Sequence, residues 1–220
     1  MTSPGSTDRT RVRRVPGKAV TDTVGLHAVL DAGLVAHVAV VDDGMAFVLP
    51  VAYARRGDEV LFHGSTGSRL FRLLAAGQPT CLTVTLLDGL VLARSAFESS
   101  MNYRSAMVLG VARRIEGADE LDALRTISEH LVPGRWDEVR PPSAKERAAT
   151  LTLALSLDES SVKVSTGGPD DDPADLRDPE LMRLWAGRVP IVESFSEPVP
   201  DDLCPPGTPV PGYVNAWRRA

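Results

Sequence analysis

Residues 80–97, TCLTVTLLDGLVLARSAF, decide the fold of this chain. The first half of the stretch is rich in threonine, valine and leucine, and it alternates apolar with polar side chains as a β-strand does. Asp88-Gly89 in its middle is a turn dipeptide typical of hairpins. We therefore expect a strand over 80–87, a tight turn, and a returning strand over 90–97, which together form an antiparallel hairpin.

Further elements flank this stretch on both sides. Branched and alternating residues predict other strands at 34–41, 45–54, 59–63, 105–115, 150–157 and 161–165. Helical spacing predicts helices at 22–33, 68–76 and 118–132, and Ser143 with Glu146 forms a capping-box pattern before a shorter one. Because the helices are inserted among many adjacent strands, the pattern predicts a mainly β, α+β barrel and argues against a doubly wound parallel sheet.

Composition divides the chain into three regions. Residues 1–20 are polar, with a net charge of +4 over the first 18, and we expect a flexible basic arm. Residues 21–166 hold the expected strands and form the predicted barrel domain. Residues 167–220 carry ten of the seventeen prolines and a net charge of −7 over 169–202. We expect this acidic, proline-rich extension to wrap the barrel or a dimer partner.

The overall composition excludes several classes of protein. A net charge of −5 disfavours nucleic-acid binding by the whole chain. The two cysteines, Cys81 and Cys204, are too isolated for a paired-cysteine zinc site or a disulfide framework. The longest apolar run is shorter than a membrane span, and the basic N-terminus lacks the apolar segment of a secretory signal. We therefore expect a soluble cytoplasmic protein without a metal site.

The segment HGSTGSR at 63–69 is a candidate phosphate site. It leaves a predicted strand through small residues and enters a predicted helix, where hydroxyls and backbone N–H groups can bind an oxyanion. Arg69 adds a charged fork, and His63 is the one histidine inside a candidate site. The alternative is an ordinary serine or threonine cap followed by a surface arginine.

Other polar clusters also have two interpretations. Residues 99–105 place Asn102, Arg104 and Ser105 before a long apolar strand, either as ligand contacts or as a polar turn. In the segment 133–136, Trp136 follows an arginine that can stack on it and fix a loop. Trp185 lies in the acidic extension and either covers a ligand or anchors the extension. The sequence contains no catalytic triad and no nucleotide-binding glycine loop of the common types.

Taken together, these segments resemble the pyridoxamine 5′-phosphate oxidase-related flavin-binding split barrels. The resemblance is strongest to the branch called predicted flavin-nucleotide-binding proteins, near the nitroimidazole-resistance reductases. It runs from about Arg14 to Pro190, and the matching segments are 37–38, 47–50, 63–69, 83–95, 100–105, 133–136 and 185–187.

The resemblance implies a six-stranded split barrel that forms a homodimer and binds FMN in a cleft between subunits. The activity it implies is that of an FMN-dependent oxidoreductase acting on a small molecule, with His63 as a candidate active-site residue. The backbone of 47–50 would lie along the flavin ring, and the segment 63–69 would hold the ribityl chain and phosphate. The implied cofactor-binding residues are Phe47, Val48, Leu49, Pro50, His63, Ser65, Ser68, Arg69, Asn102, Arg104, Ser105, Lys163 and Trp185.

One segment departs from the family pattern. Where relatives often carry Ser-Ala-Lys-Val-Arg, this chain has Ser-Val-Lys-Val-Ser at 161–165, and the hydroxyl of Ser165 cannot replace a charged guanidinium. Three alternatives to the flavin enzyme therefore stay open. They are a non-catalytic flavin-binding protein, a deazaflavin-dependent protein, and a haem-binding or haem-degrading split barrel in which His63 or His37 ligates iron.

Overall fold

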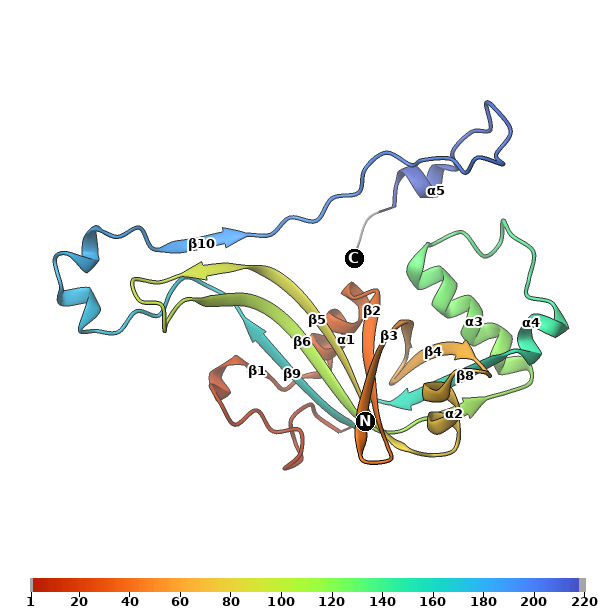
Figure 1. The fold of residues 1–220 in the computed structure, drawn as a ribbon, viewed down its shortest axis with the longest axis horizontal. Helices are drawn as coiled ribbons and strands as arrows, with labels where there is room; N and C mark the ends of the chain where they lie inside the picture. Colours follow the sequence, from red (N-terminus) through yellow and green to blue (C-terminus); the bar gives the residue numbers. More distant parts are fainter. Residues whose placement is uncertain (1, 218–220) are drawn as a thin grey trace.

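The computed structural model describes residues 2–217, in which ten strands form one antiparallel sheet. The sheet curls around a core and carries helices mainly at one end (Figure 1). The strands are β1 (Ala19–Val20), β2 (Val35–Asp42), β3 (Met45–Arg56), β4 (Glu59–Ser65), β5 (Pro79–Leu92), β6 (Ser100–Val111), β7 (Arg113–Ile115), β8 (Thr150–Ser156), β9 (Glu159–Ser165) and β10 (Gly187–Pro190). The helices are α1 (Thr23–Ala32), α2 (Arg69–Ala75), α3 (Ala118–Leu131), α4 (Ala144–Ala148) and α5 (Gly212–Asn215), with short 3₁₀ turns at Pro16–Lys18, Asp175–Arg177 and Leu181–Arg183.

The strand order makes this sheet an open barrel. It runs β1-β9-β6-β5-β2-β3-β4-β8-β7, and β10 is added beside β5. The two end strands are short and do not pair with each other in the described part of the chain. The mainly β, α+β split barrel predicted from the sequence is therefore confirmed.

The hairpin predicted at Asp88-Gly89 is wrong. β5 runs without reversal through both residues, and the chain turns only between β5 and β6. Leu87 is opposite Tyr103 and Gly89 is opposite Asn102, so Asp88 is the extra residue of a β-bulge. The glycine serves a different purpose, because a Cβ at position 89 would lie 2.8 Å from the carbonyl oxygen of Val189 on β10. Gly89 thus permits the close approach of the paired strand β10.

Short-range signals elsewhere correctly predicted where elements begin and end. Asp22 caps α1 by accepting a hydrogen bond from the backbone N–H of Gly25 at 2.8 Å. Ser143 and Glu146 form the expected capping box at α4. Between β2 and β3, Asp43 and Gly44 both have positive φ, as a tight hairpin turn requires.

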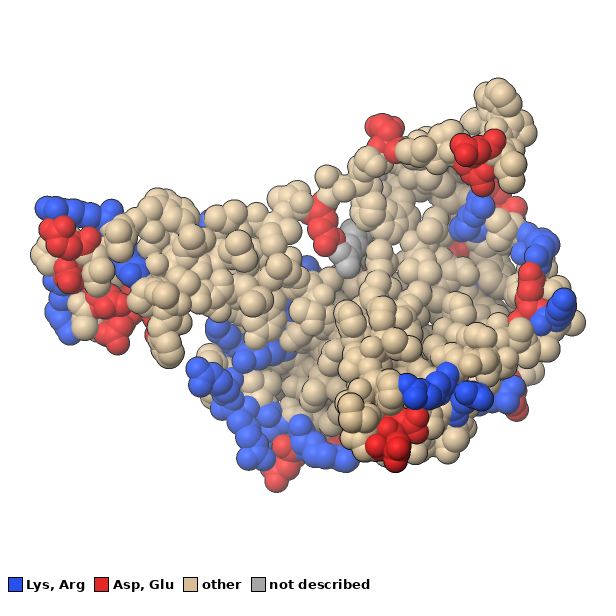
Figure 2. Space-filling model, viewed as in Figure 1, with Lys and Arg blue, Asp and Glu red and all other residues tan. Residues whose placement is uncertain are grey.

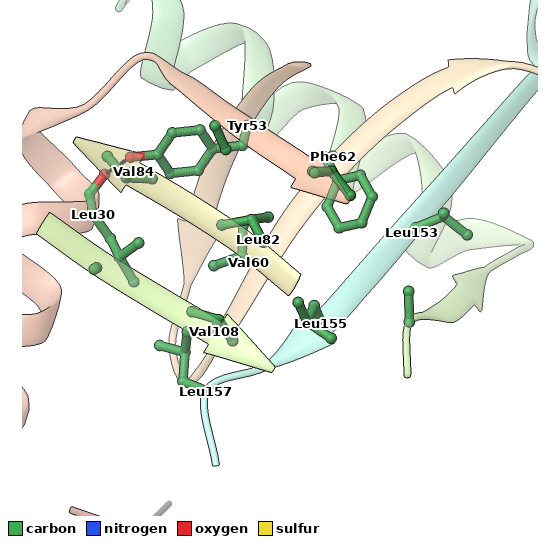
Figure 3. Close-up of a cluster of buried hydrophobic side chains, with 14 of the residues drawn as sticks. Leu30, Tyr53, Val60, Phe62, Leu82, Val84, Val108, Leu153, Leu155 and Leu157 are labelled. Atoms are coloured by element: carbon green, nitrogen blue, oxygen red, sulfur yellow. Dashed lines mark hydrogen bonds between the residues drawn. The ribbon is translucent and has the colours of Figure 1, made fainter. Parts of the chain in front are cut away.

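One large apolar cluster fills the inside of the curled sheet. Leu82, Val84, Val108 and Leu155 are fully buried there, on the inward face of their strands. Tyr53 is also buried, and its hydroxyl donates a 2.6 Å hydrogen bond to the carbonyl of Leu30 on α1 (Figure 3). A smaller cluster packs α3 against the outside of β4 and β8, through residues such as Leu61, Ile127 and Ala154. Among residues 2–217, the sheet therefore has a helix on its outer side only at the β4–β8 end.

A projecting arm extends from the barrel (Figure 1). It consists of the far ends of β5 and β6, the turn 93–99, and the segment 167–192 with β10. Asp171 attaches the two parts, because its carboxylate pairs with the Arg94 guanidinium at 2.6 Å and accepts from the Arg94 N–H at 2.7 Å. Figure 2 shows charged side chains at the free end of the arm and an uncharged stretch between that end and the barrel.

The two ends of the chain lie on the barrel in different ways. Near the N-terminus, the N–H of Gly5 donates to the carbonyl of Ser160 at 2.7 Å, and Thr10 is buried. Near the C-terminus, Trp217 donates to the carbonyl of Leu131 at the end of α3. The flexibility of residues 1–20 and the boundaries at 20/21 and 166/167 stay predictions. No helix among residues 2–217 is long and apolar enough to span a bilayer.

Candidate functional site

Most of the predicted site residues fall into four separate places in the described chain. The first place is the outer face, which we define as the side chains of β2, β3, β5, β6 and β9 that point away from the large core cluster. Ser105 and Lys163 lie on this face. The segment 47–50 lies near Arg69, His63 lines a cavity beside α3, and Trp185 lies on the arm. Each place has its own geometry.

Strand register brings a row of polar side chains together on the outer face. Thr85 is opposite Ser105, and Ser105 is opposite Lys163. These residues line an open cavity of about 320 Å³ together with Met107 and Val12 of the N-terminal segment. The Lys163 ammonium donates to the carbonyl of Arg14 at 3.3 Å, which keeps its positive charge at the rim of this cavity. The row can bind an anionic or strongly polar ligand.

β3 presents part of its backbone at an open edge. It pairs with β2 over its first eight residues, but β4 pairs only with Tyr53–Arg56, at the other end of β3. Val48, Leu49 and Pro50 are exposed there, and no described strand lies on their second side. Backbone N–H and C=O groups at an unpaired edge are obligatory hydrogen-bonding groups, so this edge can contact the polar rim of a planar ligand.

Arg69 lies beside this edge at the beginning of α2. Its guanidinium stacks over the ring of Phe47, 3.6 Å from the ring centroid, and lies 3.6 Å from the carboxylate of Asp42. In the preceding turn, the Ser65 hydroxyl accepts from the N–H of Gly67, whereas the hydroxyl of Ser68 makes no capping hydrogen bond. The stacked guanidinium is pre-oriented and keeps donors for a phosphate.

Asn102, Arg104 and Ser105 do not face one side of the sheet. The segment for which a polar turn was one of two interpretations is part of β6, so Arg104 and Ser105 point in opposite directions. Asn102 is buried and donates to the carbonyl of Gly167 at 2.9 Å. Arg104 forms a two-pronged pair with Asp88, and these hydrogen bonds raise the pKa of the guanidinium. Within one subunit the two residues hold the bulge and the extension, and cofactor contact by either stays a prediction.

His63 lines a cavity of about 450 Å³ at the helical end of the barrel. The walls come from β4 and β8 (His63, Thr150), α3 (Leu124, Ser128) and the segment 136–147 (Trp136, Val139, Arg140, Pro142, Glu146, Arg147). His63 is exposed to solvent at the cavity, yet partial burial by the surrounding protein lowers the pKa of its imidazole. The ring is therefore mostly neutral at pH 7, with a lone pair for a metal ion.

The charges around this cavity are arranged in pairs. Arg140 pairs with Glu146, and Arg147 pairs with Glu120, each at 2.7 Å. A guanidinium has five N–H donors, so both arginines keep donors for a ligand carboxylate. Sequence reasoning missed these arginines and the α3 residues, because only the packing of α3 over β4 brings them beside His63.

Trp185 lies on the projecting arm and is 66% exposed. Its ring lies against Gly187, where a Cβ would be 3.1 Å from the indole. β10 fixes this part of the arm to the far end of β5, and the arm extends away from β3 and α2 (Figure 1). Cofactor contact by Trp185 stays a prediction.

Ser165, where relatives often have arginine, is buried opposite Tyr103 in β6. A buried small hydroxyl fits this position, and it supplies no charge toward the outer face. The row of Thr85, Ser105 and Lys163 therefore has one cation, Lys163, on β9.

A cavity of about 640 Å³ lies under the C-terminal tail. Phe195 and Trp217 meet there edge to face at 4.1 Å, and Val132 and Pro198 add apolar walls. Glu197 is its one charged wall residue in the described chain. The aromatic contact holds the tail near the end of α3, and the cavity contains no histidine or cysteine ligand.

An open antiparallel barrel with an exposed strand edge, a stacked arginine and a histidine-lined cavity defines a split-barrel protein suited to planar, charged cofactors. The chain belongs to the pyridoxamine 5′-phosphate oxidase family, whose model matches residues 23–164. No protein of curated function matches it.

Several solved structures are similar. A flavocytochrome from Azotobacter vinelandii is 42% identical, with all of both chains covered and a TM-score of 0.90. A protein from Mycobacterium smegmatis described as binding FAD and haem is 40% identical, covering 90% of this chain and 96% of its own, with a TM-score of 0.85. A 5-nitroimidazole antibiotic resistance protein from Bacteroides thetaiotaomicron is 20% identical over 66% of this chain and 86% of its own, with a TM-score of 0.56, and shows the shared fold alone.

Proposed function

We propose that this chain is a flavin- and haem-binding redox protein. The observation that carries the proposal is the His63 cavity, in a chain 42% and 40% identical to a flavocytochrome and to a protein that binds FAD and haem. Haem supplies one-electron chemistry at its iron, and flavin supplies one- or two-electron chemistry at its ring.

The residues of the His63 cavity fit a haem. His63 would ligate the iron, because no hydrogen bond of the described chain occupies its imidazole. The porphyrin needs apolar walls, which Leu124, Trp136 and Val139 provide. Its two propionates need positive partners, for which Arg140 and Arg147 are suited. His37, the other histidine considered from the sequence, lies exposed on the outer face and has no such walls.

The flavin is proposed for the outer face and the neighbouring edge of β3. The backbone of 47–50 would contact the ring, and Arg69, Ser65 and Ser68 would hold the phosphate. Ser105 and Lys163 would contact the polar parts of the cofactor from the other end of the face. This site lacks a wall on its solvent side, so a second subunit is needed to exclude water.

The same open face supports a homodimer. Val41 is 56% and Val48 55% exposed, and strand register places both side chains on the outer face. An apolar patch of this kind on a soluble chain marks an interface. We propose a twofold dimer in which Trp185 of the arm approaches the flavin of the partner subunit.

The identity of the flavin separates two proposals. FMN follows from the sequence resemblance, and FAD is favoured by the 40% identical relative. Both carry the ring, the ribityl chain and the first phosphate, so Arg69 serves either one. The mass of the flavin released by heat from the purified protein decides between them. Oxidoreductase activity on a small molecule is the proposed use of these cofactors.

The absorbance spectrum of freshly purified protein, supplemented with hemin and flavin if it is colourless, tests the proposal. We expect a Soret band together with flavin bands near stoichiometric amounts. Flavin bands without a Soret band after hemin addition would indicate that the protein binds flavin and no haem. A Soret band without flavin bands would indicate a haem protein that binds no flavin. A deazaflavin would be recognised by its mass, and bound flavin that no reductant turns over would favour a non-catalytic carrier.

A further inference from the structure

Thr152 carries a buried hydroxyl that has no hydrogen-bond partner. The residue is 1% exposed in the middle of β8, and its Oγ1 contacts no donor or acceptor within the described chain. Buried polar side chains are nearly always hydrogen-bonded, and each exception needs an explanation. The explanation must lie in what surrounds Thr152.

Strand register places His63 directly opposite Thr152. The two residues form a cross-strand pair between β4 and β8, so their side chains leave the same face of the sheet, toward α3. Directly opposite residues in antiparallel strands have Cβ atoms about 4.5–5.5 Å apart. The threonine hydroxyl is one bond from Cβ and the histidine Nδ1 is two, so a small side-chain rotation brings them to about 2.7–3.2 Å.

The other neighbours of Thr152 on this face offer no partner. On its second side, in β7, lies the apolar Ile115. Along β8, Ala154 is apolar, and the hydroxyl of Thr150 already donates to the carbonyl of Glu146 at 2.8 Å. His63 is thus the polar side chain in register with Thr152, and its imidazole also has no partner among the hydrogen bonds of residues 2–217.

We propose that Thr152 is a positioning residue that accepts a hydrogen bond from Nδ1–H of His63. This bond selects the tautomer in which Nε2 has no proton and directs its lone pair into the cavity. The inference rests on the proposed function, because Nε2 is then the atom available to the haem iron. The second nitrogen of a metal-binding imidazole normally donates to such an outer partner, which fixes ring orientation and tautomer.

A hydroxyl has a different effect from a carboxylate in this position. Glu120 and Glu146, the carboxylates near the cavity, are held by Arg147 and Arg140. A neutral acceptor leaves the imidazole neutral, whereas a carboxylate would draw the Nδ1 proton and make the ligand more basic. The chain therefore supplies a neutral imidazole ligand.

The tautomer of His63 in the cofactor-free full chain is the first test, by ¹⁵N NMR of labelled histidine at neutral pH. A His63→Gln spectrum identifies the His63 signals among those of the four histidines. We expect protonated Nδ1 and unprotonated Nε2 in the wild type and in Thr152→Ser. Thr152→Val, which keeps the shape and removes the hydroxyl, should shift the population toward protonated Nε2.

A protonated Nε2 in the wild type would overturn the inference, and this outcome does not depend on any variant of Thr152. An unchanged tautomer in folded Thr152→Val would overturn it as well. Ser160→Ala is the matched control, because Ser160 has a second buried hydroxyl without a partner, on β9 away from the cavity. The control should leave the His63 signals unchanged.

The affinity for hemin, measured by titration, provides the second test. We expect Thr152→Val to weaken hemin binding about 10-fold, the lower end of the effect of removing an outer partner of a metal ligand, while Thr152→Ser and Ser160→Ala bind as the wild type does. Equal affinity in Thr152→Val and the wild type would overturn the positioning role. If the wild type binds no hemin, the proposed function fails, and the tautomer measurement still decides the inference about Thr152.

Discussion

The His63 cavity and the outer face differ in how much of each site one chain completes. The cavity is walled by β4, β8, α3 and the segment 136–147 of the same chain, and its charged wall residues are paired. The outer face has polar residues in register, such as Ser105 and Lys163, but leaves Val41 and Val48 open to solvent. One subunit can form the first site, whereas the second needs a cover.

The position of α3 causes this difference. α3 is inserted between β7 and β8 and packs on the outer side of β3, β4, β7 and β8. α1 packs on the inner side, against the large core cluster. In the described chain, no helix covers the outer side of β2, β5, β6 or β9. A helix therefore closes one end of the sheet, and a second subunit is proposed to close the other.

Removing the imidazole from the cavity should have the largest effect. His63→Ala should weaken hemin binding by more than about 100-fold, because loss of the ligand itself exceeds the 10–100-fold cost of losing an outer partner. Flavin content should stay near that of the wild type, since the flavin is proposed for the other site. Soret absorbance in a hemin titration and released flavin measure the two separately.

His37→Ala is the control for this variant, because His37 lies on the outer face. If His37→Ala abolishes the Soret band and His63→Ala does not, the assignment of the two sites is reversed.

A charge introduced on the outer face should impair flavin binding and leave hemin binding intact, the reverse of the result expected for His63→Ala. Val41→Glu should give a monomer, because an unpaired carboxylate cannot be buried in an apolar interface without a large desolvation cost. The monomer should lose most of its flavin and keep its hemin affinity. Light scattering after size exclusion gives the mass, and the spectrum of the same peak gives both cofactors.

Val24→Glu is the matched control, since Val24 is exposed on α1 and not on the outer face. A Val41→Glu monomer that retains stoichiometric flavin would contradict the shared site.

Removal of the stacked arginine should have a smaller effect within the flavin site. Arg69→Ala should weaken flavin-nucleotide binding by ~1.5–3 kcal/mol, the range for a hydrogen bond to a charged group. We expect the lower end, about 10-fold, because the guanidinium is half exposed and screened by solvent. Fluorescence quenching of the flavin measures the affinity.

Riboflavin lacks the phosphate, so its affinity for Arg69→Ala should equal that for the wild type. Equal losses for riboflavin and FMN would remove the phosphate role from Arg69 and leave it only a stacking role on Phe47.

The smallest effect concerns the arm, which lies outside both sites of its own subunit. Hydrogen bonding from the Arg94 N–H, with the ion pair to its guanidinium, lowers the pKa of Asp171 in the folded chain. A carboxyl with a depressed folded pKa stabilises the fold above its unfolded pKa, and this stabilisation disappears as the pH falls through the folded value. The Asp171→Asn variant should therefore melt below the wild type at pH 7.

The two melting temperatures should converge as the pH falls below about 4, the ordinary range of an aspartate. The exposed neighbour gives the control, since Asp170→Asn should melt as the wild type does at every pH. A difference between Asp171→Asn and the wild type that is the same at pH 7 and pH 3 would assign the effect to packing and not to charge.

Much of this fold could be predicted from short stretches of sequence. The caps at Asp22 and Ser143 and the β2–β3 turn at Asp43-Gly44 depend on neighbouring residues alone, and the capping box predicted at Ser143 is confirmed. Asp88-Gly89 is the exception, because its role is set by β10, which joins β5 from a distant part of the chain. A turn dipeptide allows the chain to reverse direction, but it does not require a reversal when another strand pairs beside it.

The candidate site was less predictable, because its residues meet through strand pairing and helix packing. The sequence by itself determined the location of most barrel strands, which residues can hold charge, and the family to which the chain belongs. The tertiary structure alone decided that Arg104 and Ser105 point apart, that His63 is opposite Thr152, and that α3 closes the cavity beside them. The physical reason is that local signals depend on the conformations of a few consecutive residues. Contacts between distant strands instead depend on register, and a shift of one residue moves each side chain to the other face.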